Sequence, residues 1–397
     1  MLSKTRNALL LLLLSLHLLS AEATWARGRG AQRVRPTSVA VVGAGNYGTA
    51  LAHRLALNGH RVKLWAREGD VVAGIRRRGY NPRFLQGIPL DRRIKPHGSL
   101  KKTLRGKKLV VLAVPSEHLA SMAKKMAPYL DRDAIVVSAT KGLSSKGGFA
   151  TMTEVLAREL SGRIDNRRLV AFSGPGFAAE IGQRKRTLVT VAANNSSIGR
   201  SVKQLFDTGG SFSVETSRDV KGVQFWGAAK TPLAIISGTL EGLGVDRGTR
   251  QAVLGQAISE LAQLGKRYGA SSNSFFTAAA LGDIVLTSSA GSRNYRLGSG
   301  LGKGRTPKQV LAQMNGQVAE GVSNAASFQQ LGRRYHIATP AFDTLSAVVA
   351  GKKPPRALLK LGRGKPTQPH KGGTWSRGVA MIETYAGVGA GLGLSFN

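Results

Sequence analysis

Three glycines at a fixed spacing, Gly43, Gly45 and Gly48, are the first residues of this sequence whose pattern suggests a chemical role. In the pattern G-x-G-x-x-G the first glycine permits a tight turn, the second lets the backbone approach a pyrophosphate, and the third lets a helix pack closely on a strand. The helix that follows offers free backbone N–H groups and the positive end of its dipole to phosphates. The three glycines therefore predict a dinucleotide site.

Arg67 and Glu68, which follow the next predicted strand, bear on which dinucleotide binds. The run 61–65 is followed, after one alanine, by Arg67 and Glu68. An acid at this point accepts hydrogen bonds from the adenosine ribose of NAD, whereas an arginine suits the 2′-phosphate of NADP. The sequence is compatible with either NAD or NADP, and NADP is favoured because Arg67 lies nearer the strand end than Glu68.

The segments around the glycines alternate between strand and helix. Ser38–Val42 is a short β-branched run directly before the turn, and Thr49–Leu57 has the composition of a helix, which Asn58-Gly59 ends. Further strands are predicted at 61–65, 108–114, 134–137, 168–172 and 187–192, with helices such as 118–130 and 149–160 between them. This alternation predicts an α/β fold with a Rossmann-type, doubly wound and mostly parallel sheet.

Three residues lie at or shortly after the carboxyl ends of these predicted strands. They are Pro115, Lys141 and Gly174. Ligands of doubly wound sheets bind along this edge, so we expect the three residues to lie near the site.

The second half of the chain changes character at about Asp219. The β-branched runs stop there, and residues 220–240, 249–268 and 273–281 place apolar side chains at helical spacing. We therefore predict an NAD(P)-binding Rossmann domain over 37–216, an all-α C-terminal domain over 217–364, and a flexible Gly-rich tail over 365–397. The glycine-rich stretch 298–304 follows no strand, so we expect a mobile linker there rather than a phosphate loop.

The first 36 residues are predicted to be a presequence. Lys4 and Arg6 precede an apolar core of about twelve residues, and Ala21-Glu22-Ala23 offers small residues to a signal peptidase. The stretch 24–37 carries four arginines and no acid, as transit peptides do. We expect a bipartite presequence that directs the chain to a plastid, with the secretory pathway or ER lumen, or an uncleaved anchor, as alternatives. No later stretch is long and apolar enough for a membrane span in the mature chain.

The composition narrows the classes of protein to consider. The 397 residues include 58 Lys and Arg against 21 Asp and Glu, a formal charge of +37 with a pI near 11.4. Such a chain favours nucleic acid, an anionic surface or an anionic substrate as partner. The absence of cysteine excludes disulfides, thiolate zinc sites and a cysteine nucleophile. The seven histidines show no ligand spacing, so no metal is expected.

Taken in order, the motifs resemble NAD(P)-dependent glycerol-3-phosphate dehydrogenase of the bacterial and plastid type. Each motif alone is common, but all of them in this order over most of the chain are specific. They are Gly43-Ala-Gly-Asn-Tyr-Gly, Asn81-Pro-Arg-Phe-Leu, Val114-Pro-Ser, Ala139-Thr-Lys-Gly-Leu, Ser173-Gly-Pro-Gly-Phe-Ala-Ala-Glu, Gly227-Ala-Ala-Lys, Leu281-Gly-Asp-Ile-Val-Leu-Thr, Ser292-Arg-Asn and Gly316-Gln-Val-Ala-Glu-Gly.

The resemblance implies reversible reduction of dihydroxyacetone phosphate to sn-glycerol 3-phosphate, which feeds glycerolipid synthesis, by a homodimer. It implies that Lys230 is the catalytic lysine, the proton donor in reduction and acceptor in oxidation, with Lys141 and Asp283 beside it. The implied substrate residues are Lys141, Gly174, Gly176, Lys230, Asp283, Ser292, Arg293 and Asn294. The cofactor residues, which include the three glycines and Arg67 discussed above, are Gly43, Gly45, Asn46, Tyr47, Gly48, Arg67, Lys141, Ala178, Arg293, Val318 and Glu320.

These implied roles make chemical sense. A hydride that arrives at a ketone carbon builds negative charge on the oxygen, which a lysine within hydrogen-bond reach neutralises. A lysine that is partly desolvated beside other cations has its pKa pulled toward the working pH. Asp283 is suited to orient that lysine, and Arg293 offers a planar fork to a phosphate.

Two places depart from the family pattern. Family members usually have asparagine after the catalytic lysine, whereas this chain has Thr231-Pro232, and Arg247 stands where asparagine is common. Because a proline inside a helix removes a hydrogen-bond donor, we expect a kink or a restart of the helix beside Lys230. The core set is intact, so we expect an active enzyme; this set is Lys141, Lys230, Asp283, Arg293 and Asn294.

Two other functions remain as alternatives. A β-hydroxyacid dehydrogenase also joins a Rossmann domain to helices through a lysine, but the cluster Ser292-Arg-Asn and the pair Gly282-Asp283 favour the phosphate substrate. A nucleic-acid-binding protein on a Rossmann scaffold is the second, because residues 61–108 hold 15 Lys and Arg against 3 Asp and Glu. That stretch has only three aromatic residues to stack on bases, so we favour a solvated basic surface that attracts anionic substrate and cofactor.

Overall fold

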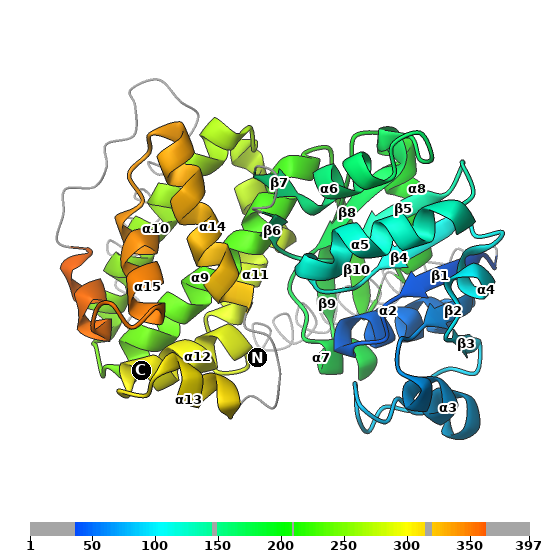
Figure 1. Ribbon diagram of the computed structural model, residues 1–397, viewed down its shortest axis with the longest axis horizontal. Helices are drawn as coiled ribbons and strands as arrows, with labels where there is room; N and C mark the ends of the chain where they lie inside the picture. The colour runs from blue at the N-terminus through cyan, green and yellow to red at the C-terminus, as the bar shows by residue number, and fades with distance from the viewer. Residues whose placement is uncertain (1–35, 145–148, 209, 314–319, 363–397) are drawn as a thin grey trace, which may run out of the picture.

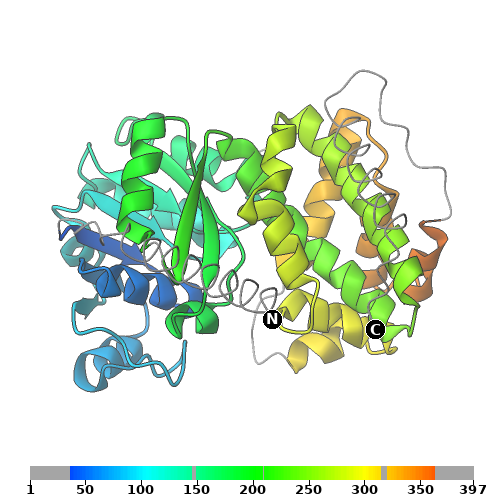
Figure 2. The same cartoon turned by 180° about the vertical axis from the view of Figure 1, so that it is seen from behind.

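The computed structural model describes residues 36–144, 149–208, 210–313 and 320–362. Within these ranges it has a mostly parallel sheet covered by helices, followed by a helical half (Figures 1 and 2). The predicted fold class is confirmed. The predicted presequence, apart from Pro36, and the predicted Gly-rich tail lie outside the described residues.

The sheet has eight strands in the order β10-β9-β8-β5-β4-β1-β2-β3. All neighbours are parallel except β8 and β9, which are antiparallel. The central strands consist of buried aliphatic residues because both faces of the sheet are covered. The bounds are β1 Ser38–Val42, β2 Arg61–Trp65, β3 Ile94–His97, β4 Leu109–Leu112, β5 Ile135–Ser138, β8 Leu169–Ser173, β9 Thr187–Ala193 and β10 Phe212–Ser217.

Alternate residues of β1 supply the cores on the two faces of the sheet. Val39 and Val41 pack in the core under α2, α3, α7 and α8, whereas Ala40 and Val42 pack in the core under α4, α5 and α6. The first group has the bounds α2 Asn46–Leu57, α3 Gly69–Arg78, α7 Ala178–Gly182 and α8 Ser196–Phe206. The second has the bounds α4 Leu100–Leu104, α5 Ser116–Met126 and α6 Met152–Glu159.

The helical half is built around α9, whose residues are buried along nearly its whole length. Helices α10, α11, α12 and α14 pack against it. Among the described helices, none is long and apolar enough to cross a membrane. The bounds are α9 Val220–Gly242, α10 Arg247–Tyr268, α11 Asp283–Thr287, α12 Arg293–Gly302, α13 Pro307–Ala312, α14 Glu320–Tyr335 and α15 Pro340–Val349.

Several elements differ from the sequence-based expectations. The two edge strands β3 and β10 were not predicted, because their sequences IKPH and FSVETS lack a run of β-branched residues, as is common at sheet edges. A short hairpin of β6 (Leu143–Ser144) and β7 (Ala150–Thr151) was also missed. The helix expected at 273–281 is instead a 3₁₀ turn, Ser272–Phe276, and a π-helical turn, Ala278–Gly282.

The prediction of a mobile linker at 298–304 is wrong, because most of this stretch belongs to α12. Its glycines are present because α12 packs backbone to backbone on α9. A Cβ on Gly298 would lie 2.1 Å from Ile235 O, and a Cβ on Gly302 would lie 2.2 Å from Thr239 O. Glycines of α9 face α12 in return: a Cβ on Gly238 would lie 2.0 Å from Tyr295 O. Only glycine allows two helices to approach this closely.

Candidate active site

The turn between β1 and α2 has the shape that its three glycines predict. Gly43 has a φ of +110°, and a Cβ there would lie 2.5 Å from Ala113 O. A Cβ on Gly48 would lie 1.9 Å from Gly43 O, so the first turn of α2 packs directly on the glycine turn. Gly45 faces open space, with no atom within 4 Å of a Cβ built there.

Two asparagines hold this turn in place. Asn81 is buried, and its Nδ2 donates to Ala44 O and Thr49 Oγ1, both at 2.9 Å. Its Oδ1 accepts from the backbone N–H groups of residues 83 and 84, and Asn46 Oδ1 accepts from Leu85 N at 2.7 Å. The loop after α3 is thereby fastened to the glycine turn. Asn81 belongs to the motif Asn81-Pro-Arg-Phe-Leu, but the sequence alone indicates no role for it.

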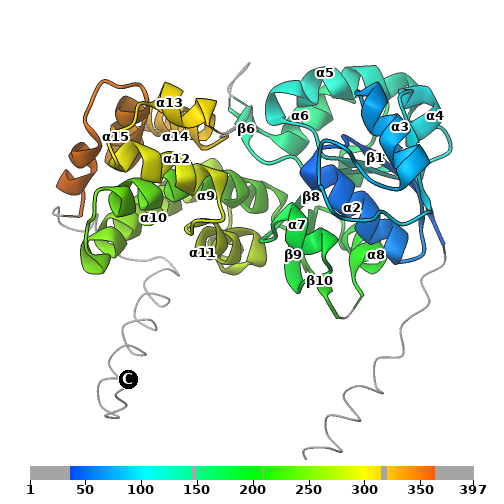
Figure 3. The ribbon, with the colours of Figure 1, turned by 90° about the horizontal axis from the view of Figure 1, so that it is seen from below.

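Three predicted catalytic residues meet at the carboxyl edge of the sheet. Lys141 lies after β5, Lys230 lies in the middle of α9, and Asp283 is the first residue of α11, directly after the π-helical turn. Asp283 is fully buried between the lysines, with Oδ2 2.6 Å from Lys141 Nζ and Oδ1 2.5 Å from Lys230 Nζ. Lys141 and Lys230, which are 142 and 53 positions from Asp283 in the sequence, thus form one cluster with it. Helices α9 and α11, which carry Lys230 and Asp283, lie on the side of the helical half that faces the sheet (Figure 3).

One carboxylate compensates only one of the two buried lysine charges. Lys141 also donates to Gly174 O at 3.1 Å and lies over the ring of Tyr47. Burial opposes its charge, but Asp283 and the other partners outweigh burial and raise the pKa of Lys141. Burial lowers the pKa of Lys230 to about 7, with the charge of Lys141 contributing to the decrease and the attraction of Asp283 opposing it. Of the two lysines, Lys230 is the one whose pKa lies near neutral pH.

The predicted phosphate cluster lies at the start of α12. Ser292 caps this helix through its hydroxyl, and Arg293 is exposed at the first helical position. Asn294 Oδ1 accepts from Gly321 N at 3.0 Å, which joins α12 to α14. Cationic and N–H groups at a helix start favour a phosphate there.

The remaining predicted residues are placed as follows. Gly174 and Gly176 lie in the loop after β8, and Ala178 begins α7. Glu320 begins α14, where burial raises the pKa of its carboxyl while Arg293 and the two site lysines oppose that rise. Arg67 lies just beyond β2, away from the lysine cluster, and Val318 is outside the described residues.

The helix restart expected at Pro232 does not occur, because α9 is one continuous helix through this residue. Pro232 has no N–H for the carbonyl of Ala228, one turn earlier. That carbonyl accepts instead from Thr231 Oγ1 at 2.8 Å and from Asn324 Nδ2 at 3.3 Å. Asn324 Nδ2 also donates to Thr231 Oγ1 at 2.9 Å. Thr231, a departure from the family pattern, thus compensates for the neighbouring proline. No sequence motif singled out Asn324.

Replacing Thr231 with valine should lower the free energy of unfolding by about 1–2 kcal/mol, because the carbonyl of Ala228 loses the hydrogen bond from the Thr231 hydroxyl. The matched control is Thr239→Val, since Thr239 is also buried and its hydroxyl donates to Ile235 O at 2.8 Å. No proline deprives that carbonyl of its backbone partner, so the control should cost less. Urea denaturation of both variants measures the difference; equal losses would contradict the role of Thr231.

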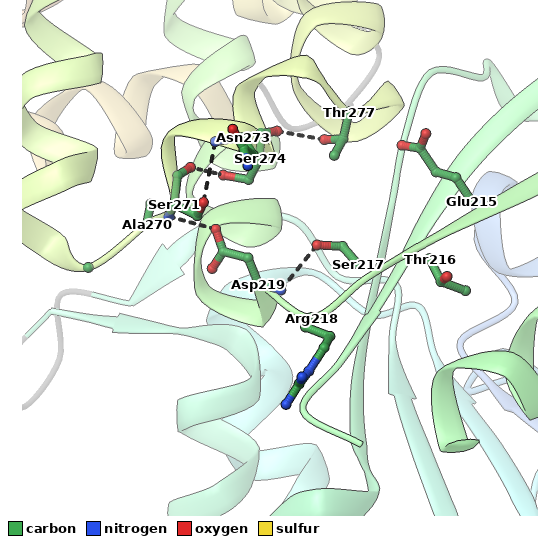
Figure 4. Close-up of a pocket in the computed structure, with 11 residues that line it drawn as sticks. Glu215, Thr216, Ser217, Arg218, Asp219, Ala270, Ser271, Asn273, Ser274 and Thr277 are labelled. Carbon is green, nitrogen blue, oxygen red and sulfur yellow. Dashed lines mark hydrogen bonds between the residues drawn. The ribbon is translucent and has the colours of Figure 1, made fainter. Parts of the chain in front are cut away.

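A separate hollow lies away from the lysine cluster. A depression of about 660 Å³ opens where β10 leads into α9, between Glu215, Asp219, Ser271 and Thr277 (Figure 4). Its polar groups bond mainly to neighbouring backbone: Asp219 accepts from Gly222 N and Ser271 N, and Glu215 accepts from Ala278 N. The depression holds no lysine or histidine, so its chemistry differs from that of the lysine cluster.

Two family models cover most of the chain. The N-terminal model of NAD-dependent glycerol-3-phosphate dehydrogenase matches residues 38–199, and the C-terminal model matches residues 219–360. The chain belongs to this family. Glycerol-3-phosphate dehydrogenase (NAD(P)+) of Geobacter sp. (strain M21) is 36% identical over 325 residues, 81% of this chain and 96% of that protein. The Myxococcus xanthus (strain DK1622) enzyme of the same name is 38% identical over 301 residues, 76% and 89% of the two chains.

The fold of the glycerol-3-phosphate dehydrogenase family extends over both halves of the molecule. A crystal structure of glycerol-3-phosphate dehydrogenase from Coxiella burnetii matches with a TM-score of 0.76 at 31% identity, over 82% of this chain and 98% of that one. Among the described residues of this family member, no group of three His, Asp or Glu side chains is placed to hold a metal.

The glycine turn fits the nicotinamide dinucleotide that the family name implies. The start of α2 has no side-chain cap, so its first N–H groups face the open space beside Gly45. The hydroxyl of Tyr47 is buried without a hydrogen-bond partner among the described residues and lies near Lys141. An unpaired buried hydroxyl beside an uncapped helix start is consistent with a bound polar group at this place.

Proposed function

We propose that this chain catalyses the reversible reduction of dihydroxyacetone phosphate to sn-glycerol 3-phosphate with NADPH or NADH. The observation that carries the proposal is the buried cluster of Lys141, Asp283 and Lys230 at the carboxyl edge of the sheet. The glycine turn lies on one side of this cluster, and the cationic start of α12 belongs to the helical half on the other. A ketone that also carries a phosphate matches these groups.

The residues of the chain divide the work between proton transfer and binding. When bound, the nicotinamide supplies or accepts the hydride. Lys230, held by Asp283, gives a proton to the carbonyl oxygen as negative charge develops, and takes it back in oxidation. Lys141 keeps its charge and stabilises the same oxygen, while Ser292 and Arg293 bind the phosphate. Because the pKa of Lys230 is about 7, both of its forms are present near neutral pH.

The direct test follows the absorbance of NADPH and of NADH with the purified chain and dihydroxyacetone phosphate. We expect oxidation of at least one cofactor, and the reverse reaction with sn-glycerol 3-phosphate. Parallel assays with 3-hydroxy acids test the β-hydroxyacid dehydrogenase alternative. Activity with the acids and none with the phosphates would reject the proposal.

We further propose that Arg67 gives a preference for NADP. Its side chain is 76% exposed beyond β2 and bonds to Glu68 Oε1, so it is available to a 2′-phosphate. Arg67→Gln should raise the KM for NADPH about tenfold or more, because a charge-assisted hydrogen bond is lost, and leave the KM for NADH nearly unchanged. Arg83→Gln, which removes an exposed arginine paired with Asp70, is the control. Equal changes for both cofactors would reject this role.

The cellular setting is proposed from the sequence and the resemblance. We propose that residues 1–36 form a bipartite presequence for a plastid, where the product serves glycerolipid synthesis, and that the enzyme is a homodimer with domains over 37–216 and 217–364. A fusion of residues 1–40 to a fluorescent protein tests the destination; secretion would reject a plastid. Sedimentation velocity tests the dimer.

A further inference from the structure

Two side chains at the edge of the sheet are bonded to the turn that precedes Asp283. Thr190 of β9 and Glu215 of β10 are register partners on adjacent parallel strands, so their side chains lie on the same face of the sheet. Thr190 Oγ1 donates to Glu215 Oε1 at 2.6 Å. Glu215 Oε1 also accepts from Ala278 N at 2.7 Å, and Thr190 Oγ1 accepts from Ala279 N at 3.0 Å. We call Thr190 and Glu215 the strand pair.

The strand pair supplies partners that the π-helical turn Ala278–Gly282 does not have within itself. The first N–H groups of a helical turn have no acceptor inside the helix. Thr277, the residue before the turn, does not cap it, because its hydroxyl donates to Ser274 O instead. The first two residues of the turn are buried, and Glu215 extends from β10 toward Thr277 (Figure 4). The strand pair therefore satisfies buried backbone groups whose loss of a partner would be costly.

The turn connects the strand pair to Asp283 through a single residue. The backbone N–H of Asp283 donates to Ala278 O, and the N–H of Ala278 donates to Glu215 Oε1. The next residue, Ala279, belongs to the same buried apolar cluster as Ala171 of β8. Asp283 thus takes its position from the sheet as well as from the helical half.

The position of Asp283 sets the strength of its two ion pairs. Its carboxylate is fully buried and lies 2.6 Å from Lys141 Nζ and 2.5 Å from Lys230 Nζ. A longer distance to Lys230 would weaken the attraction that favours the protonated form of this lysine. Rates are sensitive to such changes, since a displacement of about 1 Å can cost about 10²-fold.

We propose that Glu215, together with Thr190, is a positioning residue for the reaction, which holds the turn 278–282 so that the Asp283 carboxylate reaches both lysines. The strand pair acts through Asp283 and takes no part in proton transfer itself. For its effect on rate the inference rests on the proposed function, whereas the effect on Lys230 can be measured without turnover.

The test compares two substitutions of Glu215. Glu215→Leu removes the acceptor at similar size, whereas Glu215→Gln keeps an oxygen that accepts at the same place. Thr190→Val, which removes only the hydroxyl, is a second variant with the same expected direction. The matched control is Glu260→Leu, because Glu260 of α10 is also buried and its carboxylate accepts from Ala341 N, near the start of α15. Steady-state kinetics and urea denaturation are measured for each variant.

We expect Glu215→Leu to lower kcat for ketone reduction about tenfold at neutral pH, with a much smaller change in the KM for dihydroxyacetone phosphate. The pH at which the reductive rate falls should move to lower values, because Asp283 supports the charge of Lys230 less well. Glu215→Gln should restore most of the rate, and Glu260→Leu should change stability but neither kcat nor the pH profile. Equal losses of kcat in Glu215→Leu and Glu260→Leu, or a glutamine variant as impaired as the leucine variant, would overturn the proposal.

Competitive labelling with acetic anhydride gives a readout that needs no substrate. Mass spectrometry of the peptide that contains Lys230 follows the labelling of this lysine as a function of pH. We expect its inflection at lower pH in Glu215→Leu than in the unaltered chain, and no change in Glu260→Leu. An unmoved inflection in Glu215→Leu would overturn this inference. An unaltered chain without activity toward dihydroxyacetone phosphate would instead reject the proposed function, and the labelling would still decide whether Glu215 positions Asp283.

Discussion

Replacing Lys230 with methionine is expected to lower kcat for ketone reduction by about 10³-fold, since the group that protonates the developing alkoxide is lost. Methionine keeps much of the length and apolar character of the stem, so α9 and its packing should persist. The KM for dihydroxyacetone phosphate should change much less than kcat, because Arg293 and Lys141 remain. Steady-state kinetics in the reductive direction measure both constants.

The pH profile gives an independent readout of the same prediction. Reduction needs protonated Lys230, so its rate should fall as the pH rises through about 7, and oxidation should show the opposite trend. The inflection should vanish from the residual activity of Lys230→Met. Lys266→Met, an exposed lysine of α10, is the control and should keep both rate and profile. An inflection that survives in Lys230→Met would assign the proton transfer to another group.

The second large effect is expected for Asp283→Asn. This change leaves two buried lysines without the carboxylate that holds them, and the loss of one partner from a buried ion pair typically costs about 3–5 kcal/mol of folding free energy. Asp283 stabilises the protonated form of both lysines, so the pKa of both should fall when its negative charge is removed. The pH range for reduction should move to lower pH, and kcat should decrease at neutral pH.

Urea denaturation and the pH profile together test this prediction. Asp70→Asn is the control, because Asp70 pairs with Arg83 at 2.6 Å, the same distance as Asp283 to Lys141, but on an exposed surface. An exposed pair contributes little to stability, so this variant should unfold almost as the unaltered chain. If the two variants lost the same stability, Asp283 would not be the counter-charge of the cluster.

Much of the site was accessible from the sequence because its parts are local motifs. The three glycines predict their own turn, and the short apolar strands predict the sheet edge near which Lys141 lies. The pairing of Lys141 with Asp283, 142 positions away, is not a local property. Only the resemblance to a family brought these residues together before the structure did, and their roles remain predictions that the variants above test.

The features that the sequence does not predict depend on contacts between distant elements. Pro232 predicts a break when only its own helix is considered, but Asn324 of α14 supplies a donor for the carbonyl that proline leaves free. The glycines of α12 resemble a flexible linker until the backbone of α9 is seen against them. In both cases a partner outside the segment reverses the local expectation.

The glycine contact between α9 and α12 has a consequence for substrate selection. Lys230 lies on α9 and Arg293 begins α12, so the proposed proton donor and phosphate anchor belong to two helices with no side chains between them at Gly238 and Gly298. Because the two backbones are in direct contact, no side chains between the helices can rearrange. The distance between Lys230 and Arg293 should therefore be nearly fixed. We therefore expect the enzyme to discriminate substrates by the number of carbons between ketone and phosphate, and to reject longer keto-sugar phosphates.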